Sequence, residues 1–565
     1  MCIDVIGADI LLNCLEKQGV DLVFGLPGGA VIPLYDRLKH FEVKHILMRH
    51  EQGAIHAADG YARSTGKVGV CFATSGPGAA NMMTGLGTAN MDSIPIVMIS
   101  GQVPRPMLGK DSFQEAYVTG MSDAVTKASV MVTDASEIPQ VIADAFFIAA
   151  SGRPGPVLVD IPKDVFQQNV ENIRLDVEPT ERYQRKLKSS VITREQIRKV
   201  SHMVLEAKKP LLIVGGGVNN TATIQKNLLS VIDKLDMPVC QTLMANGVIP
   251  EDNKQFVGMV GMHGTTDGNY AIQNCDLLLA VGMRFDDRVT SDTKRFSVNS
   301  KKIHVDVDSS EIGKNVAVDL PIVGDAEEFF ELLANDCEDL QGDHSAWRQE
   351  VADHYRPLRK GDRTSLPPME LCDIINKELD ENTVVVTDVG QHQMWAALFL
   401  HPKGPRRFLT SGGLGTMGYG LPAAIGAQFG KPNDRVFLIT GDGSFQMNVQ
   451  ELCIIKEFQV PVKIIMMNNG YLGMVRQWQE MFNDGNYAST TLDVGPNWEK
   501  LTDAYDVPYY RLNNLEEAEA QLPTLLKQDG PAFIECRINQ FANVYPMIPA
   551  GCSLDEIVGE FEDEA

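Results

Sequence analysis

No stretch of the sequence holds the roughly 18 uncharged apolar residues that a helix needs to cross a bilayer. The N-terminus does not open on a basic segment followed by a cleavage site, so no secretory signal or transit segment is expected. The ten cysteines form no CxxC motif and no cysteine–histidine cluster, which argues against a disulfide framework and a structural zinc site. These absences predict a cytoplasmic protein in a reducing compartment, without a membrane partner.

Positive charge is scarce, because 50 Lys and Arg side chains stand against 74 Asp and Glu, for a net charge of −24. Such a field repels phosphate backbones, so no nucleic-acid partner is expected, and an anionic substrate would need local cations. Aromatic residues reach only 7%, beside 44% hydrophobic and 22% charged residues, which is ordinary for a globular α/β protein. At 565 residues the chain is too long for a single core.

Short apolar, β-branched runs recur with helix-length segments between them, as in "KVGVCFAT" (67–74), "PLLIVG" (210–215) and "RVFLITG" (435–441). The runs are continuous rather than alternating, which indicates strands buried on both faces, as in parallel sheets. The sequence therefore predicts the α/β class, with doubly wound parallel sheets repeated along the chain.

Two charge-rich stretches, 167–190 and 336–368, interrupt this pattern and are predicted to connect domains. The expected division is a first domain at 1–166, a middle domain at 190–340, a third domain at 366–545 and an acidic C-terminal tail at 546–565. The last eleven residues, "DEIVGEFEDEA", hold six carboxylates and are predicted to be solvated.

A weak internal repeat relates the first and third domains. Residues 68–86 ("VGVCFATSGPGAANMMTGL") and 435–452 ("RVFLITGDGSFQMNVQEL") each run a buried strand into a glycine-rich turn and then a helix. The two domains are therefore predicted to share one fold. Pro77 stands in the first turn where Asp442 stands in the third-domain turn, so only the latter carries a hard anionic ligand.

The turn "ITGDGSF" is the candidate site of chemistry, because ligands of open parallel sheets lie beyond the carboxyl ends of the strands. Gly441 and Gly443 permit close approach of a ligand to the carboxylate of Asp442. The next strand ends at Asn469, and with the backbone carbonyl of Tyr471 these oxygens suit Mg²⁺, whose remaining ligands would be phosphates and water. A GDG sequence alone is typical of a tight turn, but its pairing with "NN" is more specific.

The GDG turn followed by "NN" resembles the signature of thiamine-diphosphate-dependent enzymes. Over nearly the whole chain the motifs resemble the catalytic subunits of the acetohydroxyacid synthase (acetolactate synthase) family. The matching stretches are "FGLPGGA" (24–30), "RHEQGA" (49–54), "DSFQEA" (111–116), "SGRPGPVLVDIPKD" (151–164), "GMHG" (261–264), "RFDDR" (284–288), "DVGQHQMW" (388–395), "SGGLGTMG" (411–418) and "GMVRQWQ" (473–479).

The resemblance implies a catalytic role for Glu51, a carboxyl group that hydrogen-bonds the coenzyme's aminopyrimidine ring and promotes proton removal from its reactive carbon. In this family the diphosphate is held by another subunit, so the resemblance implies at least a dimer. Without the resemblance, Glu51 would be interpreted as an acid that benefits from a helix dipole. His50 and His56 do not have the HExxH spacing of a zinc site.

Further residues around the coenzyme follow from the same resemblance: Gly28, Gln391, His392, Gly415, Met417, Gly441, Gly443 and Ser444. Gln391 and His392 would contact the diphosphate, and the carbonyl of Gly415 would accept a hydrogen bond from the pyrimidine amino group. Met417 would be the apolar wedge beneath the coenzyme, although on sequence alone a methionine is more often core filler.

The middle domain carries "IVGGGV" (213–218), a weak dinucleotide signal at Gly215 and Gly216 that is also typical of a structural turn. The resemblance implies FAD, bound without net redox chemistry. Arg284 and Arg288 are expected one helical turn apart, facing either one anion or a solvated salt-bridge cluster. Arg153 and Asp306 are further flavin-side candidates by resemblance.

The resemblance adds Gln114 and Lys163 as catalytic residues, and it places the second 2-oxo acid against Phe113, Met474, Val475 and Trp478. Residues 474, 475 and 478 form an apolar stripe that is usual for a core. Trp478 would select 2-oxobutyrate over pyruvate, a choice in which one methylene is worth about 1–3 kcal/mol.

The sequence departs from the family pattern at Ala80, where a threonine is usual, and Gly470 leaves the orientation of the Tyr471 carbonyl less defined. Neither position carries the roles expected of Glu51, Asp442 and Asn469.

The implied activity is decarboxylation of pyruvate and transfer of the hydroxyethyl unit to pyruvate or 2-oxobutyrate, for valine, leucine and isoleucine biosynthesis. The implied assembly is a homodimer or homotetramer with a small regulatory subunit. Another 2-oxo acid decarboxylase, a pyruvate oxidase, a flavin-free acetolactate synthase and a non-catalytic scaffold remain alternatives. The chain lacks the His-His pair common in decarboxylases, and "RFDDR" with Trp478 argues against the flavin-free enzyme.

Overall fold

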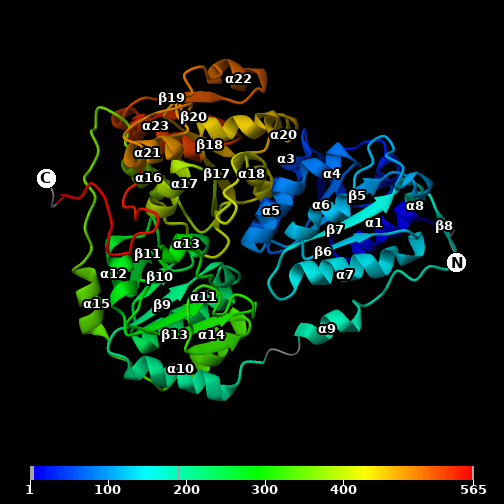
Figure 1. Ribbon diagram of the computed structural model, residues 1–565. Coiled ribbons are helices and arrows are strands. Elements are labelled where there is room, and N and C mark those ends of the chain that lie inside the picture. Colours follow the sequence, from blue (N-terminus) through cyan, green and yellow to red (C-terminus); the bar gives the residue numbers. More distant parts are fainter. Residues whose placement is uncertain (1–4, 188–190, 563–565) are drawn as a thin grey trace.

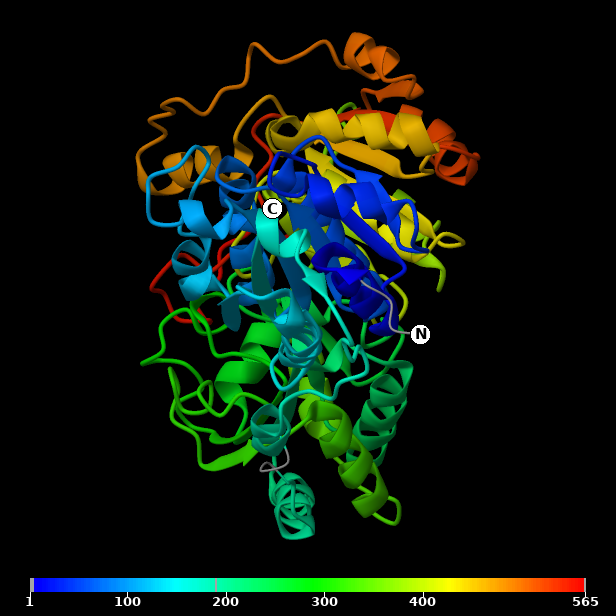
Figure 2. The same ribbon diagram turned by 90° about the vertical axis from the view of Figure 1, so that its right-hand side faces the viewer.

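The computed structural model describes residues 5–187 and 191–562 and contains three α/β units in chain order (Figure 1). Each unit is built on a six-stranded parallel sheet. The N-terminal unit, blue to cyan, lies beside the green middle unit and the yellow-to-red C-terminal unit. Seen from its own side, the N-terminal unit stands in front of the other two (Figure 2). The predicted fold class is confirmed.

The N-terminal and C-terminal sheets have the same strand order. The N-terminal order is β3 (Lys44–Leu47), β2 (Leu22–Gly25), β4 (Gly69–Ala73), β5 (Ile96–Gln102), β7 (Pro156–Pro162), β6 (Ala128–Met131). The C-terminal order is β16 (Phe408–Leu409), β15 (Thr383–Thr387), β17 (Arg435–Gly441), β18 (Lys463–Asn468), β20 (Ala532–Arg537), β19 (Tyr509–Leu512). In each, the first strand along the chain lies between the second and third, which confirms that the two units share one fold.

The middle sheet has a different order: β11 (Phe256–Met259), β10 (Val239–Gln241), β9 (Pro210–Val214), β12 (Leu277–Val281), β13 (Lys301–Asp306), β14 (Leu320–Val323). Numbered within the unit, this is the 3-2-1-4-5-6 order of dinucleotide-binding folds, whose ligands lie in the crevice where the order reverses. The reversal falls between β9 and β12. A two-stranded antiparallel pair, β1 (Val5–Ile6) and β8 (Asn169–Val170), joins the ends of the N-terminal unit.

Helices cover the faces of all three sheets. The principal ones are α1 (Gly7–Lys17), α2 (Ile32–Leu38), α3 (Glu51–Thr65), α5 (Met83–Asp92), α7 (Ile138–Ala150), α10 (Arg194–Glu206), α11 (Ala222–Leu235), α12 (Thr266–Asn274), α14 (Ala326–Asp336), α15 (Ser345–Ala352), α16 (Pro368–Asn376), α17 (Gln391–Phe399), α18 (Gly420–Gly430), α21 (Gly473–Phe482), α22 (Trp498–Ala504) and α23 (Leu515–Lys527). No helix within the described ranges combines the length and hydropathy required to span a membrane.

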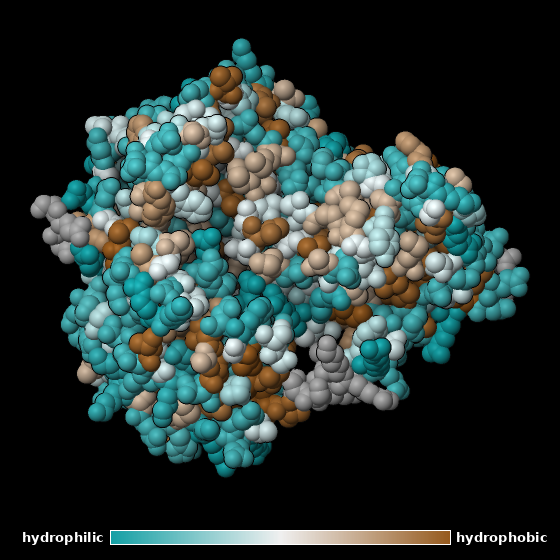
Figure 3. All heavy atoms as spheres, viewed as in Figure 1, coloured by the Kyte–Doolittle hydropathy of each residue, from teal (hydrophilic) through white to brown (hydrophobic). Residues whose placement is uncertain are grey.

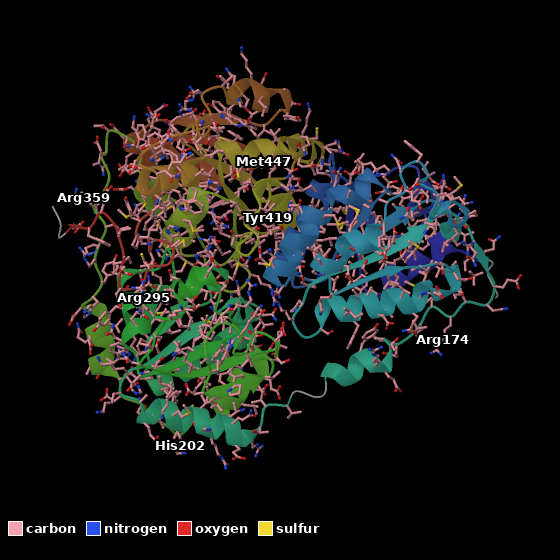
Figure 4. All side chains as sticks on the ribbon, in the orientation of Figure 1. Arg174, His202, Arg295, Arg359, Tyr419 and Met447 are labelled. Carbon is pink, nitrogen blue, oxygen red and sulfur yellow. The ribbon has the colours of Figure 1, made fainter. Side chains whose placement is uncertain are left out.

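The N-terminal and C-terminal units meet along α3 and α18, two helices rich in glycine and alanine. A Cβ atom on Gly60 would lie only 2.0 Å from the carbonyl oxygen of Ala423, so the absent side chain lets the two backbones touch. Tyr419, labelled in Figure 4, lies at this junction, and its hydroxyl donates to Asp59 Oδ1 of α3 (2.8 Å). Helix α3, whose first residue is Glu51, is thereby packed against the C-terminal unit.

The C-terminal segment differs from its predicted solvated form. Ile548 is fully buried, and its amide donates to the carbonyl oxygen of Met262 in the middle unit (2.7 Å). Phe561, inside the last eleven residues, is 1% exposed and lies under the guanidinium of Arg356. The prediction considered only the number of carboxylates and overlooked the apolar side chains. Ile548 and Phe561 pack the segment against the rest of the chain. The connection at 167–190 includes helix α9 (Glu181–Leu187), and residues 188–190 lie outside the described part.

Candidate active site

The strand β17 ends at the carboxylate expected to bind the metal. Asp442 begins the short helix α19 (Asp442–Phe445) and is only 5% exposed. Burial raises the pKa of Asp442 to about 6, so a cation beside this carboxylate would be strongly favoured. A Cβ atom on Gly441 would lie 2.7 Å from His392 Nδ1. Glycine there lets the imidazole pack against the turn.

Asn469 follows β18, the strand that pairs in parallel with β17. Its backbone amide donates to the carboxylate of Asp442. Its side-chain oxygen accepts from the amide of Tyr471 (3.0 Å), and its side-chain nitrogen donates to Gln391 Oε1 (3.0 Å). The three predicted metal-ligating residues therefore lie together at adjacent strand ends. A buried carboxylate with amide and carbonyl oxygens nearby suits Mg²⁺.

These residues surround a pocket of about 90 Å³. The predicted residues that line it are Gln391, His392, Met417, Gly441, Asp442, Gly443, Ser444, Asn469, Tyr471, Met474 and Val475. The pocket lies where the C-terminal strand order reverses, between β15 and β17, which is the expected ligand position in this architecture. Residues 5–187 and 191–562 contain no cluster of three or more His, Cys, Asp or Glu side chains that could hold a metal.

His392 has a side-chain nitrogen without a hydrogen-bond partner in this pocket. It lies in the first turn of α17, is buried, and its Nε2 has no partner. Burial lowers the pKa of His392 to about 3, so the ring is neutral. Buried polar atoms normally have a partner, and the N-terminal end of a helix favours an anion. A phosphate oxygen fits both features, and so the residues present suit the diphosphate.

Gln391 lines the same pocket, but its side chain is already engaged. Its Nε2 donates to Gln477 Oε1 and to the carbonyl oxygen of Ala542, both at 2.9 Å, while its Oε1 accepts from Asn469. Ser444 Oγ likewise donates to the carbonyl oxygen of Val389 (2.6 Å). The hydrogen bonds of these two side chains connect neighbouring segments of the pocket wall.

Met417 lies on a glycine-rich segment between the pocket and a larger cavity, and it lines both. Gly415 and Gly418 have positive φ values of 70° and 86°, which favour glycine. The amide of Gly418 donates to Asp388 Oδ1 (2.9 Å), and its carbonyl oxygen accepts from Asn448 Nδ2 (2.7 Å). The backbone beside Met417 is thus held from two sides. No role was predicted for Asp388, although it begins the matching stretch 388–395, or for Asn448, which stands in none of the matching stretches.

Glu51 lies outside this pocket in the same chain. It begins α3, is 7% exposed, and its Oε2 accepts from Asn81 Nδ2 (2.9 Å). The whole pocket lining belongs to residues 389–475. The structure thus groups the diphosphate-side and metal candidates, but it does not bring the aminopyrimidine-side candidate to them within one chain.

The other N-terminal candidates likewise lie near the carboxyl ends of their own sheet. Gly28 packs on Thr74, where a Cβ atom would meet its side chain at 2.6 Å. Gln114 has a left-handed backbone with φ of 60°, and Phe113 is 88% exposed. Lys163 directly follows β7. None of them lines the pocket at Asp442.

The larger cavity, about 800 Å³, lies where the three units meet, and the turns after β9 and β12 form part of its lining. Among the predicted residues it is lined by Arg153, Gly216, Arg284, Arg288, Asp306, Gly415, Met417, Met474, Val475 and Trp478. Burial raises the pKa of Asp306 to about 6 at the end of β13. A long crevice with a glycine turn after one strand and a carboxylate after another suits a dinucleotide.

Gly215 does not line this cavity. A Cβ atom on it would lie 2.4 Å from the carbonyl oxygen of Gly282, so it serves close packing between the turns after β9 and β12. Gly217 and Gly282 do line the cavity and were missed, although Gly217 belongs to the same glycine triplet.

The expected helical pairing of Arg284 and Arg288 is wrong. Helix α13 spans only Asp287–Thr290, so Arg284 precedes it and is 3.6 Å from Asp286. Arg288 Nη1 approaches Met262 Sδ at 3.0 Å. Both arginines line the cavity. Their spacing of four residues in the sequence did not predict the turn that separates them. Arg153 also lines it, paired with Glu311 (2.9 Å).

Comparison with known proteins agrees with this geometry. Three family models match: the thiamine pyrophosphate enzyme N-terminal TPP binding domain at 6–122, the central domain at 197–333 and the C-terminal TPP binding domain at 388–536. The fold and the pocket thus define a thiamine pyrophosphate enzyme.

Several full-length relatives are acetolactate synthases. The chain is 43% identical to the acetolactate synthase isozyme 2 large subunit of Escherichia coli, over 98% of this chain and 99% of that one. It is 42% identical to the acetolactate synthase large subunit of Porphyra purpurea, over 98% and 95%, and to acetolactate synthase 1, chloroplastic, of Nicotiana tabacum, over 98% and 85%. The chain belongs to the acetolactate synthase large-subunit family.

Proposed function

We propose that the chain is the catalytic subunit of an acetolactate synthase that converts pyruvate, alone or with 2-oxobutyrate, into acetohydroxy acids. The pocket around Asp442, Asn469 and His392, in a chain 42–43% identical to such synthases over 98% of its length, carries the proposal. When bound, thiamine diphosphate supplies the electron sink for decarboxylation. The protein supplies binding, orientation and exclusion of water.

The residues have distinct proposed tasks. Asp442, Asn469 and the carbonyl of Tyr471 would hold Mg²⁺, and His392 Nε2 would donate to a diphosphate oxygen. Met417, fixed by its neighbours, supports the coenzyme from below. Glu51 holds and moves the proton at its own carboxyl group, next to the aminopyrimidine ring.

We propose that two copies of the chain form each site. The pocket of one copy lacks Glu51, while the N-terminal unit exposes large aromatic side chains near the ends of its strands, with Phe113 88% and Tyr117 75% exposed. Apolar side chains are also visible where the N-terminal and C-terminal units meet (Figure 3). A second copy would cover such surface and bring Glu51, Gln114 and Lys163 to the pocket. A homodimer or homotetramer satisfies this requirement.

FAD is proposed for the 800 Å³ cavity where the middle unit meets the other two. Replacing Gly216 by Val should weaken FAD binding by roughly 10-fold or more, because a Cβ atom there already lies 3.1 Å from Met244 and the added methyls would enter the cavity. Flavin fluorescence quenching measures the affinity. Gly495→Val is the control, because a Cβ atom there would make only an ordinary contact, 3.9 Å from the carbonyl oxygen of Leu492. Unchanged affinity in Gly216→Val would place the flavin elsewhere.

Trp478 is proposed to select the second substrate. It lines the larger cavity with Met474 and Val475 and is 38% exposed. Trp478→Ala should lower the preference for 2-oxobutyrate over pyruvate by roughly 10- to 100-fold, through the lost apolar contact. The ratio of the two products in a competition assay measures this. Phe482→Ala, one turn further along α21, should leave the ratio unchanged, and an unchanged ratio in Trp478→Ala would remove Trp478 from this role.

A small regulatory subunit is proposed as a partner, since the relatives are named large subunits.

The function is tested by mass spectrometry of the products formed from pyruvate and 2-oxobutyrate with Mg²⁺ and thiamine diphosphate, with and without FAD. Acetolactate and acetohydroxybutyrate that form only with FAD would support the proposal. Acetaldehyde, or acetate with flavin reduction, would overturn it in favour of a decarboxylase or an oxidase.

A further inference from the structure

A carboxylate of the C-terminal unit is buried against the first turn of α3. Glu451, at the end of the 3-10 helix η6 (Gln446–Glu451), is fully buried. Its Oε1 and Oε2 accept from the backbone amide of Arg49, at 3.2 and 3.1 Å. The amide of His50 also donates to it. A Cβ atom on Gly53 would lie 2.5 Å from Glu451 Oε1, so the carboxylate occupies the space that this glycine leaves.

Two backbone amides and the side chain of Gln450, rather than a cationic side chain, hold this carboxylate. The Arg49 guanidinium pairs with Glu457 instead (3.0 Å). A carboxylate placed before the first turn of a helix satisfies amides that have no partner within the helix and interacts favourably with the helix dipole. Burial raises the pKa of Glu451 to about 7. Burying this carboxylate therefore has a free-energy cost of desolvation. The hydrogen bonds from the amides offset that cost and fix the orientation of the carboxylate.

The position of Glu451 connects two parts of the proposed chemistry. Glu51 is the first residue of α3, directly after the amides that Glu451 holds. On its other side, Glu451 ends the segment that begins at Asp442, and Asn448 in the same segment binds the backbone beside Met417. Met447, also in η6, is labelled in Figure 4 near the junction of the two units.

We infer that Glu451 is a positioning residue for Glu51: it fixes the backbone that precedes Glu51 from the C-terminal unit and so sets the direction of the Glu51 carboxyl group. This inference rests on the proposed role of Glu51. His50, the N-cap of α3, caps the same turn through Nδ1, which accepts from the amide of Gln52 (3.0 Å), but it lies in the N-terminal unit and cannot anchor the helix to the other unit.

The test compares Glu451→Ala and Glu451→Gln with Glu457→Gln in the complete chain. Glu457→Gln weakens the side-chain contact of Arg49 but leaves its backbone amide bound, which makes it a matched control. Gln keeps one oxygen that can accept a hydrogen bond, so its effect should lie between that of the parent chain and that of Ala.

The first readout is hydrogen–deuterium exchange of the backbone amides at 49–54, without coenzyme. Both Glu451 variants should exchange faster there than the parent chain, and Glu457→Gln should not. This readout depends neither on catalysis nor on coenzyme binding. Unchanged protection in both Glu451 variants would overturn the inference.

The second readout is proton exchange at the reactive carbon of bound thiamine diphosphate, followed by NMR after acid quench at saturating coenzyme and Mg²⁺. The Glu451 variants should slow it by roughly 10- to 100-fold, because small misplacements of a catalytic group have effects of this size. The coenzyme dissociation constant should change little, since the diphosphate pocket is intact. An unchanged exchange rate would overturn the positioning role even if the amides had become exposed.

The proposed function fails in a different way. If the parent chain neither bound thiamine diphosphate nor accelerated this exchange, the role of Glu51 would fall together with the inference. If the parent chain and Glu457→Gln accelerate exchange, Glu51→Gln abolishes the acceleration, and both Glu451 variants match the parent, then only the inference is wrong.

Discussion

Glu51→Gln is expected to lower turnover on the order of 10²–10⁴-fold, because an amide in place of the carboxyl group cannot exchange a proton with the aminopyrimidine ring. The substitution keeps the size of the side chain and an oxygen that can accept from Asn81. Folding and coenzyme affinity should therefore be nearly unchanged. Steady-state rates of acetolactate formation at saturating coenzyme and pyruvate measure the effect.

Glu137→Gln is a suitable control, since Glu137 is an exposed acid of the same unit. It should retain full activity. A Glu51→Gln enzyme with the parent rate would remove Glu51 from the mechanism, and a lost affinity for the coenzyme with an unchanged rate at saturation would make Glu51 a binding residue only.

Asp442→Asn is expected to weaken Mg²⁺ binding in the presence of thiamine diphosphate by more than about 100-fold. Even the loss of a residue that only hydrogen-bonds a metal ligand typically lowers metal affinity by about 10- to 100-fold. Asp442 is the acidic side chain of the pocket lining, and a hard cation prefers an anionic oxygen. Calorimetric titration of Mg²⁺ into the chain with thiamine diphosphate gives the affinity.

Asp484→Asn, at an exposed position after α21, should leave that affinity unchanged. Equal Mg²⁺ affinities for Asp442→Asn and the parent chain would show that the metal is held by other residues, and the interpretation of the GDG turn would have to be given up.

Local sequence patterns predicted the fold class and the gathering of Asp442, Asn469 and His392 around one pocket. Continuous apolar runs identify buried parallel strands, and the glycines around Asp442 and the asparagine after the next strand meet because parallel strands end at one edge of a sheet. The repeat between 68–86 and 435–452 likewise reflects the shared strand order. These features depend on residues close in sequence or one crossover apart.

Features that depend on contacts between distant segments could not be predicted. Arg284 and Arg288 have helical spacing, but a turn precedes α13 and separates them. Phe561 lies in an acidic run, yet it packs under Arg356. Glu451 contacts residues about four hundred positions earlier in the chain, and no local pattern marks a carboxylate that caps a helix of another unit.

The position of Glu51 is the most informative difference between motif and structure. The resemblance joins Glu51 and Asp442 in one site, while the pocket lining within one chain includes residues 389–475 alone. The close packing of α3 on α18 holds the helix that begins at Glu51 against its own C-terminal unit. A second copy of the chain is therefore the proposed source of the missing carboxyl group.

Mixing Glu51→Gln and Asp442→Asn chains and measuring acetolactate formation tests this account most directly. Each variant alone should be nearly inactive. Random reassembly of equal amounts into dimers should restore about a quarter of the parent activity, since half of the dimers are mixed and each of these has one site with both residues intact. A mixture as inactive as its components, with mixed dimers demonstrated by native mass spectrometry, would contradict a site shared between two copies.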